Sequence, residues 1–301
     1  MRLIGLGFAA MLLVACGGGG GGSTQDDGGI PEPQTGSATA PVTADFSCVG
    51  TSTDCSLTDF WQGAKCPPDP GFAVGGIVED FQSKENIVNA ISPTAVATVT
   101  VYETTADVLS DTPLAGPVTT DSTGRYGVTI SKSLTRVIFK TTMADSMDTY
   151  QFGQLVKTDQ TDNDRYAVAN STGDFINAWV GVAFDKTKGA IAGALRDCKH
   201  VEVANAIGKA VDPSSGAEVI PENQIFYFND AAGLPVKRSK RTYSDFDGRI
   251  LFLNVPPTTG GVTVQAWANL SGTLTEVSEA TVPVLANSII IAELDPLGPS
   301  Q

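Results

Sequence analysis

The residues of this chain with the most distinctive chemistry are its five cysteines. Cys16 lies near the N-terminus, and the other four are Cys48, Cys55, Cys66 and Cys198. In an oxidising compartment, these four thiols predict two disulfides. Three connectivities stay open, and each joins Cys198 to one of the other three. The spacing contains no C-x-x-C pair and the chain has one histidine, so the sequence does not predict a zinc site.

Catalysis is constrained by that histidine, His200. Catalytic triads, Cys-His dyads and paired-histidine zinc sites all need histidine placed against a partner, and residues 197–200 have the composition of an exposed loop. Two carboxylates at a set separation would suffice for a glycoside hydrolase, but no pair stands out. We therefore predict a protein that is not an enzyme and has no cofactor. An enzyme of carboxylate type ranks third, after a structural or binding module and a carbohydrate-binding protein.

An acidic run that contains Asp159, Asp162 and Asp164 offers the oxygen ligands that Ca²⁺ prefers. The spacing does not match an EF-hand loop, because glycine is absent from the position of the sharp turn. We therefore predict a solvated acidic loop without a metal. Calcium binding by these three residues stays open as an alternative.

The charge of the chain argues against nucleic acid as a partner. Its 33 acidic and 19 basic residues give a net charge of -14. Binding to phosphate backbones needs clustered Lys and Arg, and one such cluster is present, at residues 237–241. A solvated loop is the simpler interpretation of that cluster, so no nucleic-acid site is predicted.

The first fifteen residues have the composition of an export signal. Residues 3–14 carry no charge or strongly polar side chain. This length suits a secretory signal core of about 7 to 15 residues and falls short of the ~20 needed for a membrane-spanning helix. The segment ends in Leu13-Val14-Ala15-Cys16, which resembles the bacterial lipobox. The resemblance implies that Cys16 is acylated, and each buried CH₂ of its acyl chains contributes about 0.8 kcal/mol to anchoring.

Residues 16–45 are predicted to form a flexible tether. They open with six glycines after Cys16 and contain few large apolar side chains, so they bury too little to fold. Gly17 directly follows the predicted anchor, whereas the sorting rules of diderm bacteria chiefly retain lipoproteins with Asp at that position. We therefore predict a lipid-anchored protein of the cell envelope, in the outer membrane or at the cell surface.

Two passages of the chain repeat the same order of motifs. The first has a glycine-bearing strand at 74–80, an apolar strand at 97–102, an Asp-x-x-Gly-Arg turn at 121–125 and another strand at 136–140. The second has its counterparts at 191–197, 224–228, 245–249 and 261–267. Alternating apolar residues indicate half-buried antiparallel strands. Asp121 and Asp245, each three residues before a glycine, predict hairpin turns.

This order of motifs resembles the carboxypeptidase regulatory-like domain, a transthyretin-like antiparallel β-sandwich. The resemblance covers about residues 72–142 and 188–295. The second copy departs from the family pattern through an insertion around residues 211–222 and through Ile250, where the family prefers an aromatic residue. The resemblance implies a spacer, accessory or binding module. It assigns no catalytic residue to any position of this chain.

The predicted fold is mostly β, with two antiparallel β-sandwich domains in tandem and a short connecting helix. The predicted boundaries are 1–15 for the signal peptide, 16–45 for the tether, 46–142 for the first sandwich with its cysteine-bearing N-terminal segment, 143–187 for the connector and 188–301 for the second sandwich. The connector is expected to contain an amphipathic helix packed on a sheet, because apolar residues recur there at helical spacing: Phe175, Ile176, Trp179, Val180 and Phe184.

Exposed aromatic side chains are the remaining candidates for ligand binding, since they can form a platform for sugars. The available set is Trp61, Tyr102, Tyr126, Trp179, Tyr227, Tyr243 and Trp267, most of which we expect in the core. The predicted function is a non-enzymatic, membrane-anchored structural, adhesion or binding module, with the membrane and a glycan or surface protein as partners. The alternative is a carbohydrate-binding accessory lipoprotein, which would need aromatic side chains aligned on one exposed sheet face.

Overall fold

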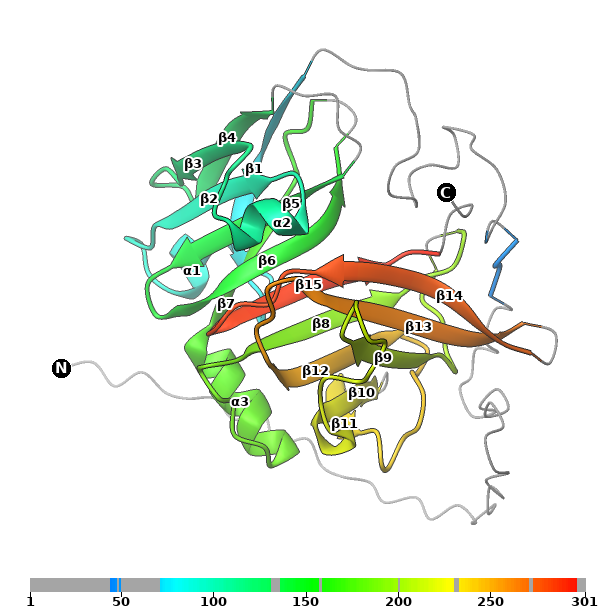
Figure 1. Cartoon of the computed structure of the whole chain (residues 1–301). Coiled ribbons are helices and arrows are strands. Elements are labelled where there is room, and N and C mark those ends of the chain that lie inside the picture. Colours follow the sequence, from blue (N-terminus) through cyan, green and yellow to red (C-terminus); the bar gives the residue numbers. More distant parts are fainter. Residues whose placement is uncertain are drawn as a thin grey trace.

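The computed structural model describes residues 44–47, 49, 71–130, 136–156, 159–199, 201–229, 233–270 and 273–296. Cys16, Cys48, Cys55, Cys66 and His200 lie outside these ranges, as do Trp61, the predicted signal peptide and most of the predicted tether. The described part is mostly β, as predicted (Figure 1). Among the described residues, no helix has the length and hydropathy to span a bilayer.

The strands divide into an N-terminal half, residues 71–169, and a C-terminal half, residues 188–296. The N-terminal half contains β1 (Phe72–Asp80), α1 (Ile87–Ala90), β2 (Ala97–Tyr102), α2 (Thr105–Leu109), β3 (Ala115–Thr119), β4 (Arg125–Ile130), β5 (Arg136–Met143), β6 (Ser146–Leu155) and β7 (Arg165–Ala169). Helix α3 (Asn170–Val180) follows. The C-terminal half contains β8 (Gly189–Leu195), β9 (Ile207–Val211), the 3₁₀ turn η1 (Glu222–Gln224), β10 (Ile225–Asn229), β11 (Leu234–Lys237), β12 (Arg249–Val255), β13 (Val262–Leu270), β14 (Thr273–Val282) and β15 (Ser288–Leu294).

Each half is built from two layers of strands. In the N-terminal half, β1 pairs with β4 and β7, and a second layer has the order β3-β2-β5-β6. In the C-terminal half, the order β11-β10-β12-β8-β15 faces the three-stranded sheet β14-β13-β9. Burial alternates along strands such as β1 and β4, which is the period of two that places one strand face in the core.

The two halves share one continuous sheet of twelve strands, in which β15 lies between β8 and β6 (Figure 1). Strand β15 runs parallel to both of these neighbours. Strands β1 and β7 are also parallel. The prediction of purely antiparallel sheets is therefore wrong, because the last strand of each half returns alongside its first strand in the same direction.

Buried side chains also cross the junction between the halves. Tyr150 and Phe152 of β6 belong to the same apolar cluster as Phe252 of β12 and Ile290 of β15. A second cluster contains Met147 of β6 together with residues of β8, β10, β12 and α3. The halves therefore bury apolar surface against each other as well as sharing backbone hydrogen bonds.

The repeat seen in the sequence is present in the structure, with one correction to its alignment. The N–H of Ala97 donates to Thr120 Oγ1 (3.1 Å), and the N–H of Ala206 donates to Ser244 Oγ (3.0 Å). Strand β2 pairs with β5 as β9 pairs with β13. The counterpart of residues 97–102 is therefore the β9 region, not residues 224–228 as predicted. Hairpin β10–β11 is an addition that extends the sheet beyond β12.

The two predicted turns are tight turns, but not hairpins. The N–H of Gly124 donates to the carbonyl of Asp121, and the N–H of Gly248 donates to that of Asp245, both at 2.9 Å. Strand β3 pairs with β2 whereas β4 pairs with β1, so the first turn joins strands that are not hydrogen-bonded to each other. The second turn precedes β12, whose partners are β10 and β8.

The region predicted as a connector, residues 143–187, contains the strands β6 and β7 as well as the expected helix α3. Val180 is buried against the sheet of the C-terminal half, and Ile176 and Phe184 pack beside it. Trp179 does not pack as predicted, because its side chain is 55% exposed. The apolar stripe of α3 is therefore narrower than the spacing indicates.

Candidate functional site

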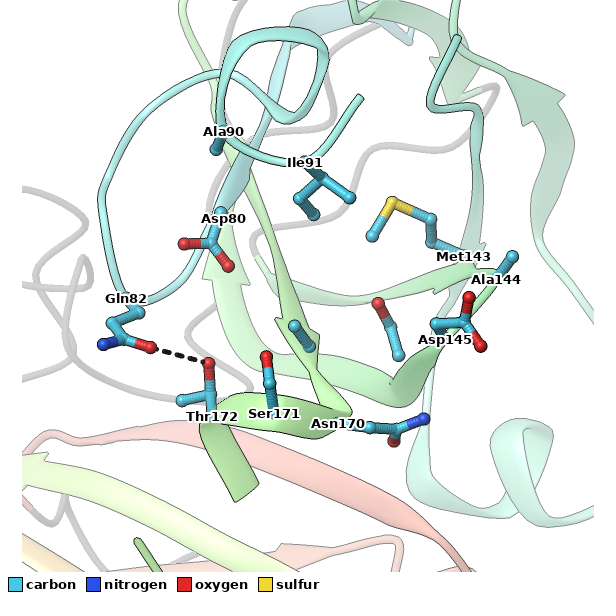
Figure 2. Close-up of a pocket in the computed structure, with 12 residues that line it drawn as sticks. Asp80, Gln82, Ala90, Ile91, Met143, Ala144, Asp145, Asn170, Ser171 and Thr172 are labelled. Atoms are coloured by element: carbon cyan, nitrogen blue, oxygen red, sulfur yellow. Dashed lines mark hydrogen bonds between the residues drawn. The ribbon is translucent and has the colours of Figure 1, made fainter. Parts of the chain in front are cut away.

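A pocket of about 450 Å³ opens where β1, α1, the β5–β6 turn and the start of α3 meet (Figure 2). This volume lies within the ~300–1,000 Å³ typical of small-molecule pockets. Ten of its lining residues are labelled in Figure 2: Asp80, Gln82, Ala90, Ile91, Met143, Ala144, Asp145, Asn170, Ser171 and Thr172. Ser146 and Ala169 complete the lining.

Asp80 ends β1 and supplies a carboxylate to one end of the pocket. Its Oδ2 accepts hydrogen bonds from the N–H and the hydroxyl of Ser83, both at 2.9 Å. These bonds fix the side chain in a turn, and the residue is only 8% exposed. Its Oδ1 accepts no hydrogen bond within the described structure, so the pocket contains a positioned acceptor without a partner.

Helix α3 begins at the pocket without a side-chain cap. Its N-cap residue is Ala169, which has no side-chain acceptor, and the N–H of Asn170 donates to the carbonyl of Asp145 (2.9 Å). The N–H groups of Ser171 and Thr172 lie in the first turn, where Ala169 supplies no side-chain acceptor. The first turn of a helix carries unsatisfied N–H groups and partial positive charge. The same pocket is therefore lined by the carboxylate of Asp80 and by the uncapped first turn of α3.

The opposite sides of the pocket differ in polarity. Gln82, Thr172, Ser171 and Asn170 follow one side, while Ile91 and Met143 lie on the other (Figure 2). The hydroxyl of Thr172 donates to Gln82 Oε1 (3.1 Å), which joins the polar side to the loop after β1. That bond leaves the amide nitrogen of Gln82 as a donor.

Two further polar groups of the lining are unpaired within the described structure. Ser146 Oγ is buried and has no hydrogen-bond partner. The carboxylate of Asp145 lies at the end of the pocket away from Asp80 (Figure 2). Lys, Arg and His are absent from the lining residues that the structure describes. The arrangement therefore suits a ligand that both donates and accepts hydrogen bonds, and carries no negative charge.

The three aspartates of the calcium alternative accept hydrogen bonds from nearby groups of the chain. Asp159 Oδ1 accepts the N–H of Ala73 (2.8 Å), and Asp164 Oδ1 accepts that of Ile77 (2.9 Å). These bonds hold the loop before β7 alongside β1. Asp162 accepts from Thr161 Oγ1 at 3.4 Å. Within the described ranges, no group of three or more His, Cys, Asp or Glu side chains is placed to hold a metal ion.

The predicted aromatic residues do not form an aligned row in the part of the chain that the structure describes. Tyr102, Tyr126 and Tyr227 are buried, as expected for core residues. Trp179 is exposed on α3. Trp267 is half-buried on the outer face of the sheet β14-β13-β9, with Lys209 Nζ 5.1 Å from its ring centroid.

A pair of carboxylates lies beside Trp267 on that outer face. Burial, together with a hydrogen bond and charge repulsion from Glu279, raises the pKa of Glu276 to about 7. Gln265 Nε2 donates to Glu279 Oε2 (3.3 Å). These groups bond mainly to one another along a strand edge, so we do not treat them as a ligand site.

No protein-family model matches the sequence, and no match was found among curated proteins. Five chains of solved structures are similar to this one, and three of them compare as follows. The shaft pilin SpaA of Lactobacillus rhamnosus GG has a TM-score of 0.22 and 13% identity, over 77% of this chain and 99% of that one. A streptococcal ancillary pilin has a TM-score of 0.19 and 13% identity, over 75% and 63%. A candidate carbohydrate-binding protein of Bacteroides uniformis has a TM-score of 0.22 and 10% identity, over 72% and 100%. Similarities at this level carry no inference about function.

Sequence reasoning missed the pocket. Asp80 is the residue that ends the glycine-bearing strand of the repeat, and its counterpart Asp197 lies in a different setting, bonded through Oδ2 to the N–H of Asp45 (2.9 Å). No sequence signal marks the pocket, because Asn170, Ser171 and Thr172 are all favoured N-cap residues and would predict a capped helix start.

Proposed function

We propose that this chain is a lipid-anchored module of a bacterial cell envelope, with a structural, adhesion or binding role and no catalytic activity. The observation that carries the proposal is the central position of β15, which is hydrogen-bonded to strands of both halves. A load applied to either half reaches the other through main-chain hydrogen bonds and a shared core. Such a body suits a spacer that holds a binding surface away from a membrane.

The contacts of residues 44–47 support attachment from the N-terminal side. The N–H of Cys198 donates to the carbonyl of Asp45 (2.8 Å), and Lys199 Nζ lies 3.0 Å from Asp45 Oδ2. The hydrogen bonds from Ser47 and Lys199 lower the pKa of Asp45 to about 2. The predicted tether would therefore end on the C-terminal half, beside Cys198.

Those contacts also favour one of the three open disulfide connectivities. Cys48 is three residues from Asp45, a span of about 10 Å at full extension. We propose that Cys198 pairs with Cys48 and that Cys55 pairs with Cys66. The first bridge would hold the end of the tether on the body, where Asp45 already bonds to Asp197 and Cys198.

Fractionation of cells that produce the full chain tests the anchor. The chain should be recovered with membranes, and Cys16→Ser should release it into the soluble extracytoplasmic fraction. Cys198→Ser is the matched control, because it removes one thiol and leaves the predicted acylation site intact. Membrane recovery of the Cys16→Ser variant would contradict the anchor.

Mass spectrometry of the unreduced protein tests both bridges, and a Cys198 peptide linked to Cys55 or Cys66 would contradict the pairing.

A second candidate function is carbohydrate binding, and the pocket at α3 is the observation that favours it. Its free donors and acceptors lie around one cavity with an apolar side, which is the pattern of a site for a small polar ligand. The aromatic platform that this alternative would need does not carry the candidate, because Tyr102, Tyr126 and Tyr227 are buried.

A further inference from the structure

We infer that the pocket at the start of α3 binds one neutral sugar ring, through hydroxyl groups that bridge Asp80 and the first turn of the helix. The inference rests on the binding role proposed above and names the ligand class for it. It depends on the buried carboxylate, the free helix donors and the polarity of the two sides of the pocket.

The buried carboxylate gives the site a fixed acceptor. Asp80 is 8% exposed and is oriented by both bonds from Ser83. A carboxylate oxygen that bonds to no other group of the described chain can accept a strong hydrogen bond from a hydroxyl donor. Because the side chain is already ordered, a ligand would lose little free energy in ordering it.

The helix start gives the site its donors. The N–H groups of Ser171 and Thr172 lie in a first helical turn without a side-chain cap, where N–H groups lack intrahelical acceptors. Gln82 uses its oxygen for Thr172, which leaves its amide nitrogen as a donor. Each hydroxyl of a sugar donates one hydrogen bond and accepts others. Neighbouring hydroxyls can therefore accept from the helix and donate to Asp80 at the same time.

Charged ligands match the pocket less well. An anion would approach Asp80 and Asp145 without a basic residue in the described lining to offset the repulsion. An alkylammonium ion would satisfy the carboxylates, but it has no acceptor for the N–H groups of α3 or for Gln82. The hydroxyl groups of a neutral polyol can donate to the carboxylates and also accept from the N–H groups.

The apolar side and the size of the pocket fit a ring. Ile91 is 43% exposed, and Met143 lies beside it across from the polar residues (Figure 2). The C–H groups on one face of a pyranose ring can pack on these two side chains, while its hydroxyls point to the polar side. Burial of apolar area contributes roughly 25 cal/mol per Å², which suits a weak site.

Ligand-detected NMR on the purified full chain tests the inference. The probes are glucose, galactose, mannose and N-acetylglucosamine, with n-butylamine and inorganic phosphate as the charged alternatives. We expect at least one sugar to bind with a Kd on the order of 1 mM, and both charged probes to remain unbound.

Two pocket variants and one control locate the binding. Asp80→Asn removes the charge of the acceptor, and Ile91→Glu places a charge on the apolar side at an exposed position. Each should weaken sugar binding by about tenfold or more. Val96→Glu is the matched control, because Val96 is 54% exposed and does not line the pocket, and it should bind as the parent does.

Three results would overturn the inference: no sugar binds, a charged probe binds in place of sugars, or sugar binding survives Ile91→Glu unchanged. If Asp80→Asn fails to fold, Ile91→Glu alone tests the sugar site, since an exposed substitution leaves the core intact. Failure here leaves the fractionation result for Cys16→Ser unaffected, so the ligand class and the envelope role are tested separately.

Discussion

The N-terminal and C-terminal halves share one plan but differ at the equivalent strands β6 and β14. Each of these strands forms the second arm of a hairpin, with β5 or with β13. Strand β6 is paired on its other edge by β15. Strand β14 pairs only with β13 among the described strands. The same strand position is thus central in one half and a sheet edge in the other.

The free edge shows how the second half avoids an unwanted partner. The pairing of β13 with β14 shifts register between Ala266 and Trp267, so the edge strand bulges. Glu276 and Glu279 place two carboxylates next to that bulge. Bulges and charges are the usual means by which edge strands resist pairing with another chain. The comparison indicates that the fold protects β6 by covering it and β14 by distorting and charging it.

The largest expected effect comes from weakening the shared strand. Ile290 of β15 is fully buried and pairs with Ile191 on one side and Tyr150 on the other. Ile290→Ala should lower the free energy of unfolding by about 3 kcal/mol, because it removes apolar contacts with both halves. Leu274→Ala on β14 should change it by less than about 0.5 kcal/mol, since Leu274 is 40% exposed. Urea denaturation measures both, and equal losses would contradict the contrast between the two strands.

The repeated turns offer the next comparison. Gly124 and Gly248 have φ of 74° and 60°, so alanine is strained at either position. A Cβ at position 248 would lie 2.5 Å from the carbonyl oxygen of Leu195, whereas a Cβ at position 124 would meet the side chain of Asn86. Backbone cannot rotate away as a side chain can. We expect Gly248→Ala to cost about 3 kcal/mol and Gly124→Ala about 1 kcal/mol. The reverse order in thermal or urea unfolding would contradict this explanation.

Removing the charges of the free edge tests its protection directly. The double substitution Glu276→Thr, Glu279→Thr leaves β14 with strand-forming residues and no carboxylate. We expect this variant to self-associate more than the parent protein. Sedimentation velocity should then show a larger sedimentation coefficient for the variant than for the parent. The double substitution Asp159→Asn, Asp162→Asn is the control for loss of two charges elsewhere. An equal increase in self-association of the two double variants would show that net charge, and not the position of the charges on β14, is responsible.

The smallest expected effect is the pH dependence that Glu276 gives to stability. Its pKa in the folded protein is raised from 4.5 to about 7. The stability that it contributes is therefore complete below pH ~4.5 and is lost as the pH rises through about 7. Glu276→Gln should flatten that part of the curve of Tm against pH, with little change at pH 4. A parallel shift of the whole curve would show that Glu276 does not titrate in this way.

The sequence predicted the strand content, the repeat and the helix at α3 because these depend on local patterns of apolar residues and glycine. It misaligned the repeat because residues 224–228 have the apolar composition of β2, although β9 occupies the equivalent place. The parallel pairing of β15 with β6 joins residues about 140 positions apart, and no local pattern specifies it. The pocket depends on the same kind of distant contact, because Asp80 and Thr172 become neighbours only when β1 and α3 meet.

The place of β15 has a consequence for biosynthesis. The strand completes the centre of the sheet, yet it is synthesised after every other strand of the described part. Until residues 288–294 emerge, β6 and β8 each lack a neighbour, and contacts between distant residues form slowly. For the export proposed above, this delay is favourable, because translocation needs an unfolded chain. A chain cut short before Ser288 would instead keep two open edges, and we expect such products to aggregate or be degraded.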